Sequence, residues 1–307
     1  MVAPSGEQYE ITGGGYRAVV TECGGGLRVL EYDGQPLVDG YDVDQHASAG
    51  RGQLLIPWPN RIEDGRYTFD GRDLQLPISE PARNNASHGL TRWASWTLEE
   101  QTGNSVSLVY RLMAQTGYPW TVDLHVVHDL SADGLTVTVT ASNMSGSPAP
   151  YALGAHPYLT VGGDGVDGWE LTVPASTRIL TDDRMLPAGR EDVSDTPYDF
   201  RVQRPVKDLS FDHAFTDLIR GSDGRAEVLV SSSSTKRAVA LWMDEAHGWL
   251  QVYSGDDLAP AARRRSLAVE PMTAGANAFR TREDLVVLGP AGSPDDTHTA
   301  SWGIRAL

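Results

Sequence analysis

The chain has 307 residues, of which 40% are hydrophobic and 21% charged, and its formal net charge is −16. This balance is typical of a globular protein and excludes the disordered and fibrous classes. The negative charge argues against nucleic-acid binding, which uses clustered Lys and Arg. No window holds the ~18 consecutive apolar residues of a membrane span. The single cysteine, Cys23, excludes an internal disulfide framework and a thiolate metal cluster.

The first ten residues, "MVAPSGEQYE", carry neither the basic start nor the apolar run of a signal peptide. We therefore expect a protein that is not exported. A lone cysteine also fits a reducing compartment, so we expect a cytoplasmic location. We further expect a monomer or homodimer, with no membrane partner.

Short segments that alternate apolar and polar residues recur in chain order, and this pattern is typical of β-strands. The expected strands are "RAVVTEC", "GLRVLEY", "RYTFDG", "DLQL", "SWTLEEQ", "SVSLVYRL", "WTVDLHVVHDL", "GLTVTVTAS", "WELTVP", "AEVLVSSS", "RAVALWMD", "WLQVYSG" and "SLAVEP". The segments 120–130 and 134–142 are joined by "SADG", which has good turn chemistry. They predict a β-hairpin.

The simplest architecture is a single all-β domain over residues 1–307, a large antiparallel β-sandwich of two packed sheets. The 32 glycines and 18 prolines supply many turns, and no long helical period competes. Residues 290–300 read as a loop before a last short strand in "SWGIRAL".

Two titratable residues stand directly before a proline within apolar segments. His156 precedes Pro157 in "YALGAHPYLTV", and Glu270 precedes Pro271 in "SLAVEP". Because proline lacks an N–H and restricts the residue before it, each position is expected at the end, edge or bulge of a strand. A lone histidine in a strand is more often structural than catalytic, so His156 needs partners.

Three further segments offer such partners. Asn60 and Arg61 follow two prolines in "IPWPNRIEDGRY", where Arg61 either pairs with Glu63 or Asp64 or grips a polar ligand. His88 lies in the Gly/Asn/Ser-rich segment "NNASHGL", and Asp212 lies in "SFDHAF". Each of these has an ordinary alternative as a turn or cap residue.

Several kinds of site have no sequence support. His125 and His128 are three positions apart, so on a strand they point to opposite faces. The sequence also lacks HExxH, CxxC, the Ca²⁺-loop pattern, GxSxG and a P-loop. We expect no metal and no cofactor.

Taken in order, "PNRI…GRYTFDG", "SHGL…W", "GAHPYL", "FDHAF", "WLQVYSG" and "AVEPMTAGANAF" resemble the aldose 1-epimerase family, also called galactose mutarotases. The match runs from about residue 54 to about residue 279 and covers most of the chain. The resemblance implies a large antiparallel β-sandwich with a sugar cleft, and interconversion of the α and β anomers of a free hexose such as glucose or galactose.

The resemblance also implies residue roles. Carried over by position, Glu270 is the general base and His156 the general acid. The substrate-binding residues are Asn60, Arg61, His88 and Asp212. Mutarotation needs only a base for the C1 hydroxyl and an acid for the ring oxygen. We expect Glu270 to start ionised and His156 protonated, with the carboxylate raising the pKa of the histidine.

Three other functions stay open. A hexose-6-phosphate 1-epimerase would need a phosphate contact, for which "RRR" at 263–265 is the candidate. A non-catalytic carbohydrate-binding protein would lack the acid or the base. A glycosidase would use two carboxylates, for which Asp212 and Glu270 are the candidates.

Overall fold

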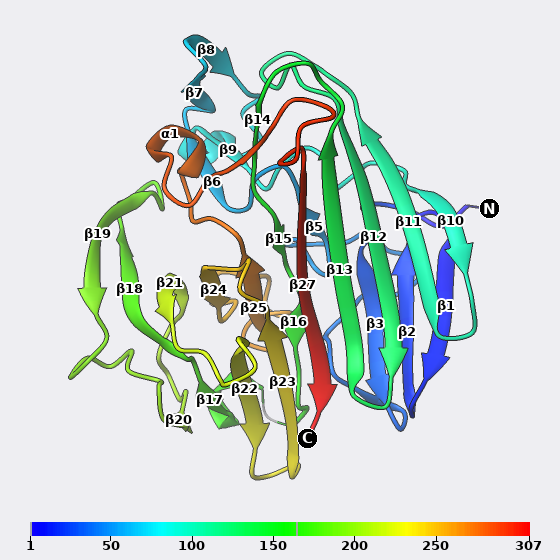
Figure 1. Cartoon of the computed structure of the whole chain (residues 1–307). Helices are drawn as coiled ribbons and strands as arrows, with labels where there is room; N and C mark the ends of the chain where they lie inside the picture. The colour runs from blue at the N-terminus through cyan, green and yellow to red at the C-terminus, as the bar shows by residue number, and fades with distance from the viewer. Residues whose placement is uncertain (1, 164) are drawn as a thin grey trace.

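Antiparallel strands form nearly all regular structure in the computed structural model, which describes residues 2–163 and 165–307 (Figure 1). A nine-stranded sheet contains, in spatial order, β10 (Thr97–Gln101), β11 (Ser105–Leu112), β12 (Val122–Ser131), β13 (Gly134–Asn143), β27 (Thr297–Ala306), β23 (Arg237–Met243), β22 (Ala226–Ser232), β17 (Glu170–Thr172) and β20 (Arg204–Pro205). An eight-stranded sheet contains β19 (Pro187–Asp192), β18 (Ala175–Thr181), β21 (Asp212–Leu218), β24 (Trp249–Tyr253), β25 (Leu267–Met272), β15 (Gly154–Ala155), β5 (Leu54–Leu55) and, paired with β25, β16 (Tyr158–Leu159).

Smaller sheets complete the fold. A four-stranded sheet of β1 (Gln8–Gly13), β2 (Tyr16–Thr21), β3 (Leu27–Tyr32) and β4 (Gln35–Pro36) contacts β11 and β12, and its blue strands lie behind them in Figure 1. The strand pairs are β6 (Arg61–Glu63) with β9 (Asn85–Ser87), β7 (Arg66–Phe69) with β8 (Arg72–Gln75), and β14 (Ala149–Tyr151) with β26 (Val286–Leu288). In the described residues the α-helical content is one turn, α1 (Ala278–Thr281).

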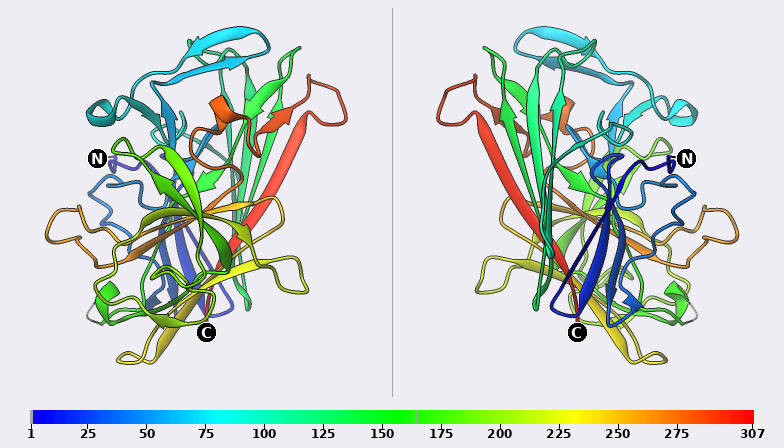
Figure 2. Two further views of the ribbon diagram at one scale, coloured as in Figure 1. Left: turned by 90° about the vertical axis from the view of Figure 1, so that its left-hand side faces the viewer. Right: turned by 90° about the vertical axis from the view of Figure 1, so that its right-hand side faces the viewer.

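The expected all-β sandwich class is confirmed, since every strand pair is antiparallel and the sheets are open. One large cluster of buried apolar side chains extends from Ile11 on β1 to Ile304 on β27, and so joins the beginning and end of the chain. Figure 2 shows β27 (red) beside the green strands from two opposite sides. That residues 1–307 form a single domain stays a prediction. Within the described residues, no helix has the length and apolar character to cross a bilayer.

The predicted hairpin is confirmed. β12 and β13 pair from Val122 opposite Asn143 to Ser131 opposite Gly134. On β13 Leu135, Val137 and Val139 are buried, and the threonines between them are half-buried. The alternation read from the sequence therefore sets which face of the strand packs on the core.

The predicted boundary of the last strand was wrong. β27 begins at Thr297, inside the expected loop. Its hydroxyls pair with those of β13: Thr299 with Thr140 at 3.0 Å and Thr297 with Ser142 at 2.9 Å. Cross-strand hydroxyl pairs of this kind stabilise neighbouring strands, and they extend the sheet through a polar segment that apolar alternation did not reveal.

The opposite orientation of His125 and His128 is also confirmed, because His128 is buried and the His125 side chain is 40% exposed. Burial lowers the pKa of His128 to about 3. The unfolded chain then binds a proton below pH 6.5 that the folded chain does not, so folding free energy is lost as the pH falls through this window.

We expect His128→Leu to weaken the acid sensitivity of the fold. The contribution of His128 to the pH dependence of the wild type is at most about 1.4 kcal/mol per pH unit. Between about pH 7 and pH 5 the variant should therefore retain roughly 2 kcal/mol more of its unfolding free energy. Urea denaturation at a series of pH values measures this. His125→Leu, on the exposed face of the same strand, is the matched control; equal pH dependence in His128→Leu and wild type would contradict the prediction.

Candidate active site

One cavity of about 310 Å³ brings together every residue that the sequence predicts for the site. These residues are Asn60, Arg61, His88, His156, Asp212 and Glu270. They come from segments far apart in the chain, and the eight-stranded sheet and the β6–β9 pair assemble them.

His156 and Glu270 face one another in this cavity. The imidazole Nε2 lies 3.3 Å from the Glu270 Oε1, and both side chains are buried, at 7% and 3% exposure. Glu270 lies on β25, and His156 lies in the break between β15 and β16, which both pair with β25. The two groups are therefore neighbours because adjacent strands of one sheet carry them.

The two prolines have different effects. Pro157 lies in the strand break as expected: the His156 N–H donates to the Gln53 carbonyl at 3.0 Å, and the Pro157 carbonyl accepts from Val269 at 3.1 Å. The expectation that Glu270 ends its strand was wrong, since β25 continues through Pro271 to Met272. Pro271 sits opposite Leu250 and only removes one donor from the ladder.

Burial decides the charge state of this pair. It lowers the pKa of His156 to about 3; an interaction with the residue's own backbone opposes this shift, and the Arg92 and Arg51 cations add to it. It raises the pKa of Glu270 well above its usual range, and Asp212 adds to this. The expected starting state, an ionised Glu270 beside a protonated His156, is therefore not the one that the empty site favours, because the loss of hydration outweighs the attraction between the two charges.

Arg61 does not pair with Glu63 or Asp64, the two partners considered from sequence. Its Nε and Nη2 contact the two oxygens of Glu80 at 2.8 and 3.1 Å, and its Nη1 is 3.4 Å from the Asn60 Oδ1. A guanidinium held by two parallel hydrogen bonds has a fixed plane, so Arg61 is presented to the cavity in one orientation.

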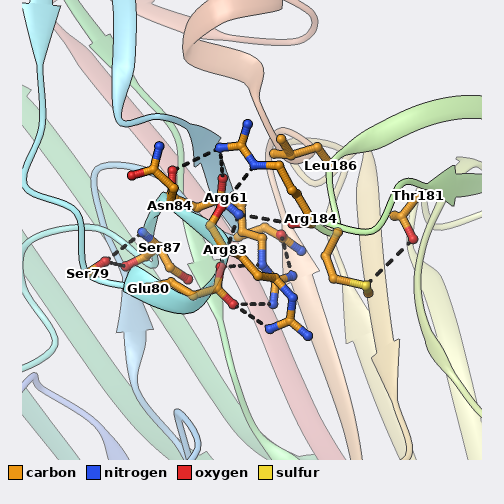
Figure 3. Close-up of polar contacts among 12 residues, drawn as sticks. Arg61, Ser79, Glu80, Arg83, Asn84, Ser87, Thr181, Arg184 and Leu186 are labelled. Carbon is orange, nitrogen blue, oxygen red and sulfur yellow. Dashed lines mark hydrogen bonds and ion pairs between the residues drawn. The ribbon is translucent and has the colours of Figure 1, made fainter.

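Figure 3 shows that the support of Arg61 extends to a second segment. Arg83 also points at Glu80, with its Nη1 2.9 Å from Oε1. Arg184, from the turn between β18 and β19, donates to the carbonyls of Arg83 and Asn84, both at 3.0 Å. These hydrogen bonds connect the turn after β18 to the segment 80–84, which contacts Arg61 through Glu80.

Asp212 is linked to Asn60 through Gln251. The Gln251 Nε2 donates to the Asp212 Oδ1 at 2.7 Å, and the Asn60 Nδ2 donates to the Gln251 Oε1 at 3.3 Å. Burial raises the pKa of Asp212, while the Arg61 cation opposes this. Gln251 lies opposite Glu270 in the β24–β25 register. It is a cavity residue that sequence reasoning missed, although its motif "WLQVYSG" was one of the six.

His88 lies beside the acid–base pair. Its backbone has a φ of 61° and its N–H donates to the Asn60 carbonyl at 2.9 Å. The His88 ring meets the His156 ring edge-on, with 5.6 Å between centroids. Burial, and then His156, lower the pKa of His88 well below its usual range, so it is a neutral hydrogen-bonding group at the cavity wall.

Among residues 2–163 and 165–307, no group of three or more His, Cys, Asp or Glu side chains is arranged to hold a metal ion. The polar groups of the cavity are instead paired with one another or directed into it. They can bind hydroxyl groups and move protons.

Comparison with known proteins shows which family the chain belongs to. The family model described as aldose 1-epimerase matches residues 7–293. The chain belongs to the aldose 1-epimerase family. Among relatives of this family, the Escherichia coli protein named "Uncharacterized protein YihR" is 34% identical over 98% of this chain and 94% of its own length.

Other aldose 1-epimerase relatives are more distant. The galactose mutarotase of Rattus norvegicus is 27% identical over 70% of this chain and 65% of the rat protein, and the aldose 1-epimerase of E. coli is 26% identical over 70% and 66%. The GalM/aldose epimerase homologue from C. elegans shares the fold, with a TM-score of 0.87, 20% identity and 98% coverage of both chains.

The arginines considered for a phosphate contact lie outside this cavity. In the described structure, none of the residues 263–265 lines it. Arg264 pairs with Asp167 and Asp256, each at 2.7 Å, and Arg265 pairs with Asp39 at 2.8 Å. Arg264 and Arg265 are therefore held in ion pairs with acidic side chains of the same chain.

We expect Arg61→Ala to raise KM more than it lowers kcat. Arg61 lines the cavity but lies outside the His156–Glu270 contact, so we expect its loss to remove binding that the ground and transition states share. Initial rates of anomer exchange over a range of sugar concentrations separate the two parameters. Arg66→Ala, at an exposed position of β7, is the control; unchanged KM and kcat in Arg61→Ala would contradict its assignment.

Proposed function

We propose that this protein is an aldose 1-epimerase that interconverts the α and β anomers of free hexoses such as glucose or galactose. Glu270 is the general base and His156 the general acid. The observation that carries the proposal is the 3.3 Å contact between the His156 Nε2 and the Glu270 Oε1 inside a cavity lined by hydroxyl-binding groups.

The geometry of this pair suits a hemiacetal. In the ring opening, the base removes the proton of the C1 hydroxyl, the acid protonates the ring oxygen, and the C1–O5 bond breaks to give the open-chain aldehyde. Both oxygens are bonded to the same carbon. Two groups within hydrogen-bond distance of one another can therefore address both oxygens at once. Rotation about C1–C2 and closure on the other face give the other anomer.

The proton count of the pair is the same in its neutral form and as an ion pair. A protonated Glu270 beside a neutral His156 differs from a carboxylate beside an imidazolium only in the position of one proton between Oε1 and Nε2. Burial favours the neutral form in the empty site. The polar groups of a bound sugar favour the ion pair that starts the reaction, because they replace part of the lost hydration.

The other cavity residues suit a sugar ligand. Asn60, Arg61, His88 and Asp212 supply donors and acceptors for hydroxyl groups and fix the ring orientation. The cavity volume of about 310 Å³ is within the range of small-molecule sites, which begins at about 300 Å³.

A second candidate is a 1-epimerase of aldose phosphates. The observation that favours it is Arg92, which lines the cavity and whose buried Nε has no hydrogen-bond partner within the described part of the chain. Burial lowers the pKa of Arg92. An anionic group on the sugar would stabilise such a cation.

The deciding experiment is exchange NMR of the purified protein with a panel of free and phosphorylated aldoses, with and without EDTA. The proposal expects faster α–β exchange with free glucose or galactose than with the 6-phosphates. Faster exchange with the phosphates would favour the second candidate. Sugar binding without exchange would mean a carbohydrate-binding protein, and hydrolysis of an aryl glycoside would mean a glycosidase, so either result overturns the proposal.

A further inference from the structure

The imidazole of His156 lacks the usual means of orientation. A histidine that transfers a proton through Nε2 is commonly held by a hydrogen bond at its other ring nitrogen. Here the Nδ1 of His156 is buried and has no hydrogen-bond partner among residues 2–163 and 165–307. The 3.3 Å approach of Nε2 to Glu270 must therefore be fixed by packing.

Tyr158 supplies one part of that packing. Its ring stacks on the His156 ring with 5.0 Å between centroids and 17° between planes. The Tyr158 hydroxyl donates to the Ala49 carbonyl at 2.9 Å. The Arg51 guanidinium lies over the same tyrosine ring, 4.4 Å from its centroid, and Asp39 holds this buried cation at 3.3 Å. Tyr158 is thus fixed at its hydroxyl and at its ring.

Gly50 supplies a second part. A Cβ atom at this position would lie 2.6 Å from the His156 Cδ2, so only glycine permits the backbone to pack this closely on the ring. Gly50 also has a φ of +78°, which favours glycine. Two residues further on, the Gly52 N–H donates to the His156 carbonyl at 2.9 Å. The loop at residues 49–53 therefore contacts the ring, the backbone of His156 and the hydroxyl of Tyr158.

We infer that Tyr158 and Gly50 are positioning residues, which hold the His156 ring by packing so that Nε2 faces Glu270 and the ring oxygen of the sugar. This inference rests on the proposed function. A flat ring stacked on a fixed flat ring, with backbone against its edge, cannot rotate about its side-chain bonds without losing contact. The packing takes the place of an Nδ1 hydrogen bond.

The test compares Tyr158→Leu with Tyr158→Phe. Phenylalanine keeps the stacked ring and loses only the hydroxyl bond, so its kcat should stay near that of the wild type. Leucine removes the flat ring, and a misplaced catalytic group costs roughly 10–100-fold in kcat. KM should stay near the wild-type value in both, because Tyr158 lines the cavity but its hydroxyl donates to the Ala49 carbonyl and not to the sugar. The Nε2 and Nδ1 signals of His156 in ¹⁵N NMR should shift in the leucine variant only.

Because Tyr158 is buried, its replacement by leucine can also lower stability, so Gly50→Ala is the second variant. The added methyl group pushes on the His156 ring from the loop at residues 49–53, which is a different element from the one that carries Tyr158. We therefore expect kcat to fall again and KM to stay nearly unchanged. Circular dichroism checks that each variant is folded. Wild-type kcat in either folded variant, Tyr158→Leu or Gly50→Ala, overturns the inference, as does an equal loss in Tyr158→Phe and Tyr158→Leu. Absence of exchange in the wild type itself would instead overturn the proposed function.

Discussion

Replacing Glu270 with Gln is expected to lower kcat for anomer exchange by roughly 10²–10⁴-fold, the usual contribution of a positioned base. The amide has the shape of the carboxyl group and can still accept a hydrogen bond, but it cannot take the C1 hydroxyl proton. Exchange NMR or polarimetry of freshly dissolved α-D-glucose or α-D-galactose measures the loss. KM should change less than kcat, because the groups that bind the hydroxyls remain.

A matched control for this substitution is Glu227→Gln. Glu227 lies on β22 and pairs with Arg305 at 2.7 Å at the surface, away from the cavity lining. It should leave exchange unchanged. Exchange at the wild-type rate in Glu270→Gln would remove Glu270 from the mechanism, and an equal loss in Glu227→Gln would point to a general effect of lost charge.

Stability gives an independent measure of the same carboxyl group. Its pKa is raised in the folded protein above the ordinary 4.5. As the pH rises above this value the unfolded chain gives up the proton first, so the wild type loses unfolding free energy relative to Glu270→Gln. The difference should grow with pH by at most about 1.4 kcal/mol per pH unit. This readout tests the buried state of Glu270 even where no sugar is present.

Part of the fold could be predicted because the chain encodes it locally. β12 and β13 alternate apolar and polar residues over most of their length, and a four-residue turn sequence joins them. β19 could not be found in this way. Its sequence, "PAGRED", forms an exposed edge strand with almost no buried side chain, so it carries no apolar signal. The expected last strand was shorter than β27 for a related reason, since the first residues of β27 pair through hydroxyl groups and carry no apolar signal.

That residues now seen in one cavity could be named from the sequence has a different reason. The residue–proline pairs at 156 and 270 are local irregularities in apolar strands, and the ordered motifs brought in the remaining partners. Contacts that depend on strand register were not accessible. Gln251 enters the cavity because it lies opposite Glu270, and Glu80 holds Arg61 across a separation of 19 residues. The charge state of His156 also depends on its burial, which a sequence motif does not reveal.

Replacing His156 with Asn is expected to lower kcat by roughly 10²–10⁴-fold as well. Asparagine can donate a hydrogen bond to the ring oxygen of the sugar, but its amide cannot transfer a proton at neutral pH. The ring oxygen would then have to leave as an alkoxide or take its proton from water. His125→Asn, on the exposed face of β12, is the control, since it removes a histidine far from the cavity lining.

The double variant Glu270→Gln/His156→Asn separates a concerted pair from two independent contributions. If each group acted alone, the two losses in kcat would multiply. Groups that move one proton between them act as a unit, and such losses are grossly non-additive. The 3.3 Å contact between the His156 Nε2 and the Glu270 Oε1 indicates that the two groups act as a unit. We therefore expect the double variant to be about as slow as the slower single variant, whereas multiplied losses would show that the base and the acid work without one another.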